Sequence, residues 1–227
     1  MANPNIELLT AMAHAMGPLC DQVVFVGGCA TGLLITQPLV ADARATKDVD
    51  AIVQVVSLAG YHALTRQLMK LGFKQTMADN TPPFRWFWRG MQLDLVPLDE
   101  KVLGFANRWY KPAFEAAQTT VLPSGLQLRH LSPPYFMATK LEAFKDRGNH
   151  DVYLSHDLED VITLVDGREE LVPELSVAAA DVRAFVGATI QAVLRNADFS
   201  NVLPGIVSQS TRSGIVLGRL KQIANFQ

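Results

Sequence analysis

The chain has 227 residues, of which 49% are hydrophobic and 19% are charged, and its formal net charge at pH 7 is -2. This composition supports one large domain or two small ones with a sizeable core, so global disorder is excluded. With 20 basic residues against 22 acidic ones, bulk charge does not favour binding to nucleic acid or to a membrane surface, although a local basic groove remains compatible with it.

The cysteines, one long uncharged stretch and the N-terminal residues indicate the cellular compartment in which the protein is expected. Two cysteines, Cys20 and Cys29, are too few for a disulfide scaffold, and no Cys or His spacing is typical of a zinc site. Residues 22–41 carry no charge over about the length of a bilayer span, but glycines, a glutamine and a proline interrupt them. The first 16 residues lack the basic segment of a secretory signal. We therefore expect a soluble, cytoplasmic protein with no membrane partner.

The first third of the chain alternates between helical and β patterns. Apolar residues at helical spacing predict a helix over 5–18, and VVFVGG at 23–28 predicts a buried strand that ends in glycines. A helix should begin directly after these glycines, and VDAIVQV at 49–55 predicts the next strand. Ser57 is a suitable N-cap for a further helix that Gly72 ends.

Three β-like segments follow, at 73–76, 84–88 and 91–97. Arg89 and Gly90 between the last two predict an antiparallel hairpin. Two arginines are interleaved with four aromatic residues at 84–89, and we expect about half of this set to pack in the core, with base stacking as the alternative for the rest.

Beyond Asp99 the pattern becomes mostly helical. The expected elements are a helical region near 99–117, a strand at 126–132, helices that begin at Ser132-Pro133 and at Ser155, and helices over 176–196 and 213–225. The predicted fold class is α+β: a small mixed or antiparallel sheet with flanking helices over residues 1–130, followed by a mostly helical region over 131–227.

Three aspartates in two of the predicted strands carry the main chemical signal. Asp48 and Asp50 flank Val49 at the start of a strand, and because side chains alternate across a strand, both carboxylates face the same side. Asp94 lies between two leucines in the hairpin strand. If the two strands lie side by side, the three carboxylates converge, and like charges so close require cations. Two Mg²⁺ ions, or Mn²⁺, suit a set of carboxylate and phosphate oxygens.

The alternative for each carboxylate is structural. Asp48 would end the loop before its strand, and Asp94 would pair with Arg85 or Arg89 across the hairpin. For either carboxylate alone we favour this alternative, whereas the D-x-D combined with the downstream strand carboxylate favours a metal site. The glycines before the D-x-D either form a simple tight turn or allow the backbone to approach a phosphate group.

These motifs, in this order, resemble a known group of enzymes. VVFVGG, then R-x-T-x-D-x-D, then QLDLVP resemble the DNA polymerase β superfamily of nucleotidyltransferases. The segment KLEAFKDR…SHDLEDV resembles the K-x-x-A-x-x-x-R…D-x-x-D region of the AbiE-type toxin nucleotidyltransferases, and its matching residues are Lys140, Ala143, Arg147, Asp157 and Asp160. The resemblance spans residues 20–170. Gly-Gly stands where the superfamily usually has Gly-Ser, and the segment 29–47 before the D-x-D is longer than is common there.

The resemblance implies a metal-dependent transfer of a nucleoside monophosphate from an NTP to an acceptor hydroxyl, with Mg²⁺ or Mn²⁺ as cofactor. Asp48, Asp50 and Asp94 would be the catalytic metal ligands, and Asp94 would also help to deprotonate the acceptor. The residues implied to contact the nucleotide or its phosphates are Gly27, Gly28, Thr31, Arg44, Thr46, Lys47, Lys140 and Arg147. The acceptor would be RNA, with tRNA favoured for a toxin-like member, or a protein hydroxyl, and a cognate antitoxin would be a partner.

Several alternatives stay open at this stage. Lys140 and Arg147 could form a solvated surface pair with neighbouring acids, while Asp157 and Asp160 either orient those basic side chains or are ordinary acids at a helix N-terminus. The competing function is a catalytically inactive nucleotide- or partner-binding module of the same fold. A sugar-nucleotide glycosyltransferase also uses a D-x-D, but it gives no role to the glycines or to Asp94.

Overall fold

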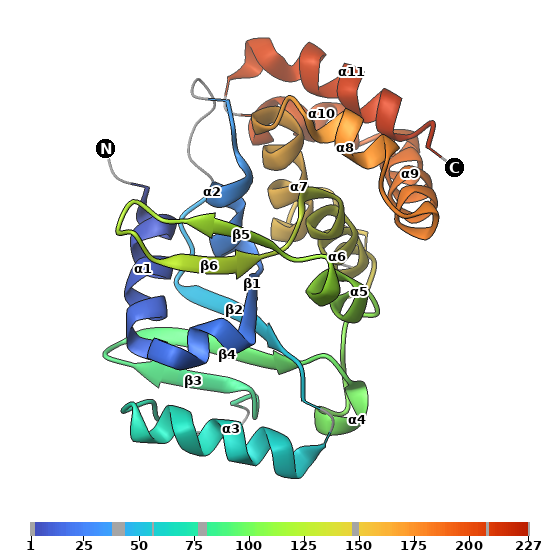
Figure 1. Cartoon of the computed structure of the whole chain (residues 1–227). Coiled ribbons are helices and arrows are strands. Elements are labelled where there is room, and N and C mark those ends of the chain that lie inside the picture. Colours follow the sequence, from blue (N-terminus) through green and yellow to red (C-terminus); the bar gives the residue numbers. More distant parts are fainter. Residues whose placement is uncertain are drawn as a thin grey trace. The chain divides into compact units, whose positions relative to one another are not determined.

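The computed structural model describes residues 3–37, 44–55, 57–76, 81–146, 150–207 and 209–226. It forms two compact units: unit 1 comprises residues 1–33 and 45–132, and unit 2 comprises residues 34–44 and 133–227 (Figure 1). The predicted α+β class is confirmed, with a six-stranded mixed sheet and flanking helices in unit 1 and helices in unit 2. The described residues 34–37 and 44 belong to the helical unit, which the sequence did not indicate.

The sheet of unit 1 combines parallel and antiparallel neighbours. Its strands are β1 (Val23–Val26), β2 (Asp48–Val53), β3 (Arg85–Trp88), β4 (Met91–Pro97), β5 (Gln118–Val121) and β6 (Gln127–His130), in the spatial order β3-β4-β2-β1-β6-β5 (Figure 1). The pairs β2–β4 and β1–β6 are parallel, and the other three pairs are antiparallel. The parallel pairing brings strands that are far apart in the sequence next to one another at the centre of the sheet.

The predicted hairpin is confirmed, and its turn explains its geometry. Arg89 and Gly90 join β3 to β4 with φ values of 48° and 84°, a two-residue turn whose twist matches that of paired strands. The segment at 73–76 contributes only a single bridge, from Lys74 to Phe87. Strand β5 was not predicted, because its sequence QTTV is polar and largely exposed at the edge of the sheet.

Local capping determines where the helices of unit 1 begin. Helix α1 (Pro4–Met16) begins at Asn3, whose side chain accepts hydrogen bonds from two backbone amides of the first turn. Helix α3 (Leu58–Lys70) begins at Ser57, whose hydroxyl accepts from the amide of Gly60, as predicted. The expected helical region at 99–117 consists of two short helices, α4 (Glu100–Leu103) and α5 (Tyr110–Glu115).

The hydrophobic core lies between one face of the sheet and the helices α1 and α3. Strands β1, β2 and β4 contribute alternate residues to it, and the helices contribute their apolar stripes. The main contributors are Phe25, Val49, Ala51, Leu93, Leu95, Leu9, Met12, Met16, Leu64 and Leu68. Trp86 of β3 also packs in this core, whereas the intervening residues of the strands project from the other face. Asp48, Asp50 and Asp94 are on that other face.

Unit 2 is helical. Its helices are α6 (Pro133–Asp146), α7 (His156–Gly167), α8 (Leu171–Ser176), α9 (Ala180–Arg195), α10 (Phe199–Ile206) and α11 (Ser213–Ile223). Ser155 caps α7 as predicted, because its hydroxyl accepts from the amide of Leu158. At the other end of α7, Arg219 donates to the carbonyls of Val165 and Asp166, which offsets the unpaired acceptors of a helix C-terminus.

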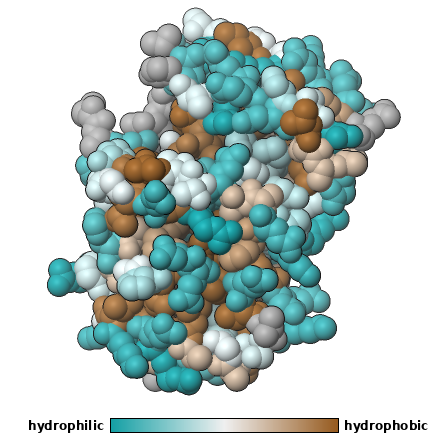
Figure 2. Space-filling model, in the orientation of Figure 1, coloured by the Kyte–Doolittle hydropathy of each residue, from teal (hydrophilic) through white to brown (hydrophobic). Residues whose placement is uncertain are grey.

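The face of the molecule that is drawn in Figure 2 carries scattered hydrophobic groups. Figure 2 shows hydrophobic residues interspersed among hydrophilic ones on the visible face. Among the described residues, no helix combines the length and the apolar character that crossing a bilayer requires. The uncharged stretch from residue 22 consists, where it is described, of the strand β1, a 3-10 turn (Gly28–Ala30) and the one-turn helix α2 (Thr31–Leu34).

Candidate metal centre

The register of β2 and β4 brings the three predicted carboxylates together. Asp50 is the direct partner of Asp94 in this parallel pair, and Asp48 is the partner of Gln92. Since partners in a ladder project from the same face, the two strands place their acidic side chains side by side. One oxygen of each of the three carboxylates lies within 4.8 Å of the others. The convergence expected from the sequence is therefore present.

The donor set suits a hard divalent cation. Mg²⁺ binds carboxylate oxygens at about 2.0–2.1 Å, so oxygens on opposite sides of one ion are about 4.2 Å apart. Carboxylate oxygens within 4.8 Å of one another need only small side-chain rotations to reach that spacing. Asp94 is 5% exposed, whereas Asp48 and Asp50 are half-buried, so the cluster is open enough for an ion to enter.

The backbone of Gly27 lies very close to the carboxylate of Asp50. It follows β1 directly, with φ of 72°, and Val26 before it is the register partner of Asp50. A Cβ atom built on Gly27 would lie 2.8 Å from Cγ of Asp50 and closer still to its Oδ2 atom. Only glycine combines this conformation with this close approach. The first of the two predicted glycines therefore shapes the space that the Asp50 carboxylate occupies.

Arg85 of β3 binds the third carboxylate from the side of the hairpin. Its Nε donates to Oδ1 of Asp94 at 2.9 Å, and its Nη2 donates to Oδ2 at 2.7 Å. The side-chain amide of Gln92 adds a longer contact to Oδ1 at 3.3 Å. The hydrogen bond to Asp94, together with the charges of Asp94, Asp48 and Asp50, raises the pKa of Arg85. The pair with Arg85, which was the structural alternative for Asp94, is therefore present together with the cluster of three carboxylates.

Arg89 does not take part in this pairing. It lies in the hairpin turn, and its guanidinium stacks over the ring of Trp88 at 4.6 Å. Trp88 in turn packs on Phe73 and donates its indole N–H to the carbonyl of Leu71. Trp86 and Trp88 are therefore packing groups, as expected for half of the aromatic residues of the hairpin.

The predicted phosphate loop after β1 has little helix in it. Gly28 and the next two residues form a 3-10 turn, and α2 contains only one turn. Thr31 is fully buried, and its hydroxyl has no hydrogen-bond partner among the described residues. Cys29 is also buried and donates its thiol to the carbonyl of Val26. A phosphate group at this loop would therefore meet backbone atoms around Gly27 and Gly28 rather than exposed side chains.

The segment before β2 contributes its predicted residues in different ways. Thr46 donates its amide to the side chain of Asn5 and its hydroxyl to the carbonyl of Asp48, so it anchors the start of β2. Lys47 is exposed, directly before the first aspartate. Arg44 is part of unit 2, where its Nε lies 3.6 Å from a carboxylate oxygen of Glu159.

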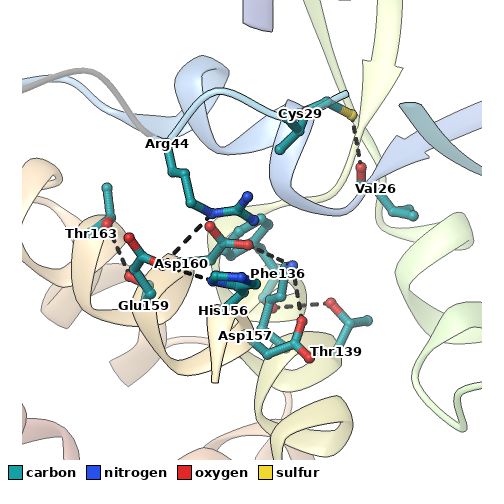
Figure 3. Close-up of polar contacts among 12 residues, drawn as sticks. Val26, Cys29, Arg44, Phe136, Thr139, His156, Asp157, Glu159, Asp160 and Thr163 are labelled. Carbon is teal, nitrogen blue, oxygen red and sulfur yellow. Dashed lines mark hydrogen bonds and ion pairs between the residues drawn. The ribbon is translucent and has the colours of Figure 1, made fainter. Parts of the chain in front are cut away.

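Lys140 is at the centre of a second charged group, within unit 2. It is 8% exposed, and its Nζ lies 3.0 Å from Oδ1 of Asp157 and 2.6 Å from Oδ2 of Asp160. Figure 3 shows these two aspartates on the first turns of α7. The alternative of a solvated surface pair for Lys140 is therefore wrong, because two buried acids hold its ammonium group. Arg147 lies outside the described residues.

The contact from Gln92 to Asp94 was not predicted from the sequence, and the choice of Arg85 over Arg89 as the partner of Asp94 was left open. The alternation of side chains along a strand was the signal that could have found both contacts. It places Gln92 on the same face as Asp94, and it places Arg85 on the face opposite the core residue Trp86.

No protein-family model matches the chain, and the search of curated proteins found no significant match.

Proposed function

We propose that this protein is a metal-dependent nucleotidyltransferase that transfers a nucleoside monophosphate from an NTP to an acceptor hydroxyl. The observation that carries the proposal is the set of three carboxylates within 4.8 Å on one sheet face. The close approach of Gly27 to Asp50 supports it, since only glycine lets the carboxylate lie this close to the end of β1. The sequence resemblance to polymerase β-like nucleotidyltransferases points to the same chemistry.

In this proposal the residues act chiefly by position and charge. Asp48, Asp50 and Asp94 would hold Mg²⁺ or Mn²⁺, which neutralises the phosphate oxygens and polarises the reacting phosphorus when bound. The backbone at Gly27 and Gly28 would lie along the triphosphate. The acceptor oxygen forms a bond to the α-phosphorus, its proton leaves to a nearby carboxylate or to water, and the bond to pyrophosphate breaks.

The acceptor and the further partners follow only from the resemblance. We propose RNA, with tRNA as the first candidate, or a protein hydroxyl as the acceptor, and a cognate antitoxin as a partner. A cytoplasmic location fits an enzyme that uses NTPs. Lys140 would contact the nucleotide. Because Lys140 also pairs with Asp157 and Asp160, a test must separate its effect on nucleotide affinity from its effect on stability.

The decisive experiment incubates the protein with each of the four α-labelled NTPs, Mg²⁺ and total RNA or protein lysate. We expect label in a polymer and an equal amount of released pyrophosphate, both abolished by EDTA and in Asp50→Asn. The matched control is Asp21→Asn, which removes an exposed carboxylate that precedes β1 and is not part of the three-carboxylate cluster. Absence of both label and pyrophosphate with every NTP would reject the proposed activity.

One observation favours a second candidate, a nucleotide- or partner-binding module without turnover. Both oxygens of Asp94 already accept hydrogen bonds from Arg85, which neutralises this carboxylate in the absence of metal. Calorimetric titration with each NTP separates the two candidates. A binding module should bind NTP without releasing pyrophosphate, whereas the enzyme should bind it in a metal-dependent manner and turn it over.

A further inference from the structure

The pairing of Arg85 with Asp94 joins an edge strand to the acidic cluster. Arg85 and Asp94 are register partners on β3 and β4, so the guanidinium approaches the carboxylate from directly across the hairpin. The two hydrogen bonds, at 2.9 and 2.7 Å, form the planar fork that fits a carboxylate best. Asp94 is 5% exposed, so rotation of its carboxylate away from this fork would break two charge-assisted hydrogen bonds in a nearly buried site.

This fork leaves part of each Asp94 oxygen available. A carboxylate oxygen accepts about two hydrogen bonds or ligand bonds, and Arg85 uses one position on each. Gln92 contacts Oδ1 as well, at 3.3 Å, so Oδ2 is the less occupied of the two oxygens. Arg85 therefore decides which oxygen positions of Asp94 remain for a cation shared with Asp48 and Asp50.

The same guanidinium also experiences the charge of the whole cluster. Its partner Asp94 has a carboxylate oxygen within 4.8 Å of those of Asp48 and Asp50, so Arg85 lies within the field that would attract a divalent cation. A fixed positive charge at this position opposes the binding of another positive charge. The side chain of Arg85 is 31% exposed, so solvent screens part of this repulsion.

From these contacts we propose that Arg85 is a positioning residue of the metal centre, which fixes the carboxylate of Asp94 and competes with the cation for its oxygens. The inference rests on the proposed function, because it assumes that a divalent cation binds between the three carboxylates. In the absence of the ion, Arg85 offsets the repulsion among them. When the ion binds, Arg85 keeps Asp94 aligned with the other two ligands and weakens the binding of the ion.

The test measures Mn²⁺ affinity by electron paramagnetic resonance in the full-length protein. Arg85→Gln removes the competing charge, so we expect Mn²⁺ to bind about tenfold more tightly than in the wild type. Arg89→Gln is the matched control, since it removes an equal charge from the same hairpin at a residue that stacks on Trp88 and leaves Asp94 paired. The proposed competition would be overturned if Arg85→Gln and the wild type had equal Mn²⁺ affinity. It would also be overturned if Arg89→Gln raised the Mn²⁺ affinity as much as Arg85→Gln does.

A second variant tests the orientation of Asp94. Arg85→Lys keeps the charge but replaces the planar fork by a point contact. We expect an Mn²⁺ affinity within about twofold of the wild type, a changed Mn²⁺ line shape and slower turnover. Wild-type line shape and turnover in Arg85→Lys would show that the fork does not position Asp94.

Stability measurements cover the case in which a variant folds poorly. Without metal, Arg85→Gln leaves three carboxylates without this counter-charge, so its melting temperature should fall. Mn²⁺ should then raise the melting temperature of Arg85→Gln more than that of the wild type, because the ion replaces the missing charge. A variant that stays unfolded in saturating Mn²⁺ would overturn the inference, since Arg85 would then be a structural residue.

Failure of the inference and failure of the proposed function give different results. If the wild type binds no Mn²⁺, or binds it equally well as Asp48→Asn, the metal centre itself is rejected and the inference with it. If Asp48→Asn loses Mn²⁺ binding while Arg85→Gln matches the wild type, the metal centre stands and only the role of Arg85 is rejected.

Discussion

Asp50 and Asp94 are register partners on the parallel strands β2 and β4, so their carboxylates leave the sheet on the same face, opposite the hydrophobic core. The residues next to them in each strand, Val49, Ala51, Leu93 and Leu95, are fully or almost fully buried on the core side. A shift of one residue in this register would turn one carboxylate into the core. The same hydrophobic burial that holds the strands together therefore also holds the two carboxylates side by side.

Replacing either aspartate of the D-x-D should abolish activity without loss of the fold. In Asp48→Asn and Asp50→Asn we expect transfer from NTP to fall at least about 100-fold, because a neutral amide is a poor ligand for a hard cation. The melting temperature without metal should stay level or rise, since one repulsive charge is gone. Labelled-NTP turnover and thermal denaturation measure the two effects. Full activity in both variants would contradict the metal assignment.

Gly27→Ala should disturb the cluster through contact as well as through backbone strain. The new methyl group would press on the carboxylate of Asp50, and the backbone of Gly27, with φ of 72° and ψ of -171°, lies in a region almost restricted to glycine, where alanine costs about 1–3 kcal/mol. We expect weaker Mn²⁺ binding together with lower stability to urea.

Gly125→Ala is the matched control for this variant. Gly125 has a similar φ of 84°, but no atom lies within 4 Å of a Cβ built there. The control should lose some stability because its φ is also positive, and it should keep its Mn²⁺ affinity. Equal Mn²⁺ binding in the two variants would mean that Gly27 acts only as a turn residue.

The ammonium group of Lys140 should be essential for the stability of unit 2. Lys140→Met would leave Asp157 and Asp160 as buried carboxylates without their counter-ion, and breaking a buried pair in this way costs about 3–5 kcal/mol. Adding Asp160→Asn to Lys140→Met should recover part of that loss, because it removes one unpaired charge. Urea unfolding of the single and double variants measures the recovery.

The nucleotide affinity of these variants tests the second assignment of Lys140. If Lys140 also contacts the NTP, affinity should fall in Lys140→Met and stay low in the double variant even where stability recovers. Unchanged affinity in both would restrict Lys140 to its structural pairing.

Both cysteines should be unreactive in the folded protein. Burial, with a smaller contribution from the charge of Asp21, raises the pKa of Cys20 to about 11, so only about one thiol in a thousand is ionised at pH 8. Cys29 is fully buried and donates its thiol to a backbone carbonyl. Ellman's reagent should therefore label neither thiol at pH 8 until denaturant is added, and its reaction with Cys20 should become faster as the pH approaches 11. Rapid labelling of native protein at pH 8 would contradict this burial.

Local patterns in the sequence were sufficient to predict much of this protein. The caps at Ser57 and Ser155 and the two-residue turn at Arg89-Gly90 depend on residues close together in the chain. The alternation of side chains along a strand likewise placed Asp48 and Asp50 on the same face of one strand and Asp94 opposite the leucines of another. These features follow from backbone geometry and nearby hydrogen bonds, which a short stretch of sequence contains.

Only the tertiary structure decided how these pieces combine. Parallel pairing of β2 with β4 joins residues more than 40 positions apart, and it determines that Asp94 meets Asp50. The choice of Arg85 over Arg89 depends on cross-strand register, and the burial of Lys140 between Asp157 and Asp160 depends on the packing of α6 against α7. Such contacts are selected by the burial of whole hydrophobic faces, and their partners lie too far apart in the chain for local patterns to specify them.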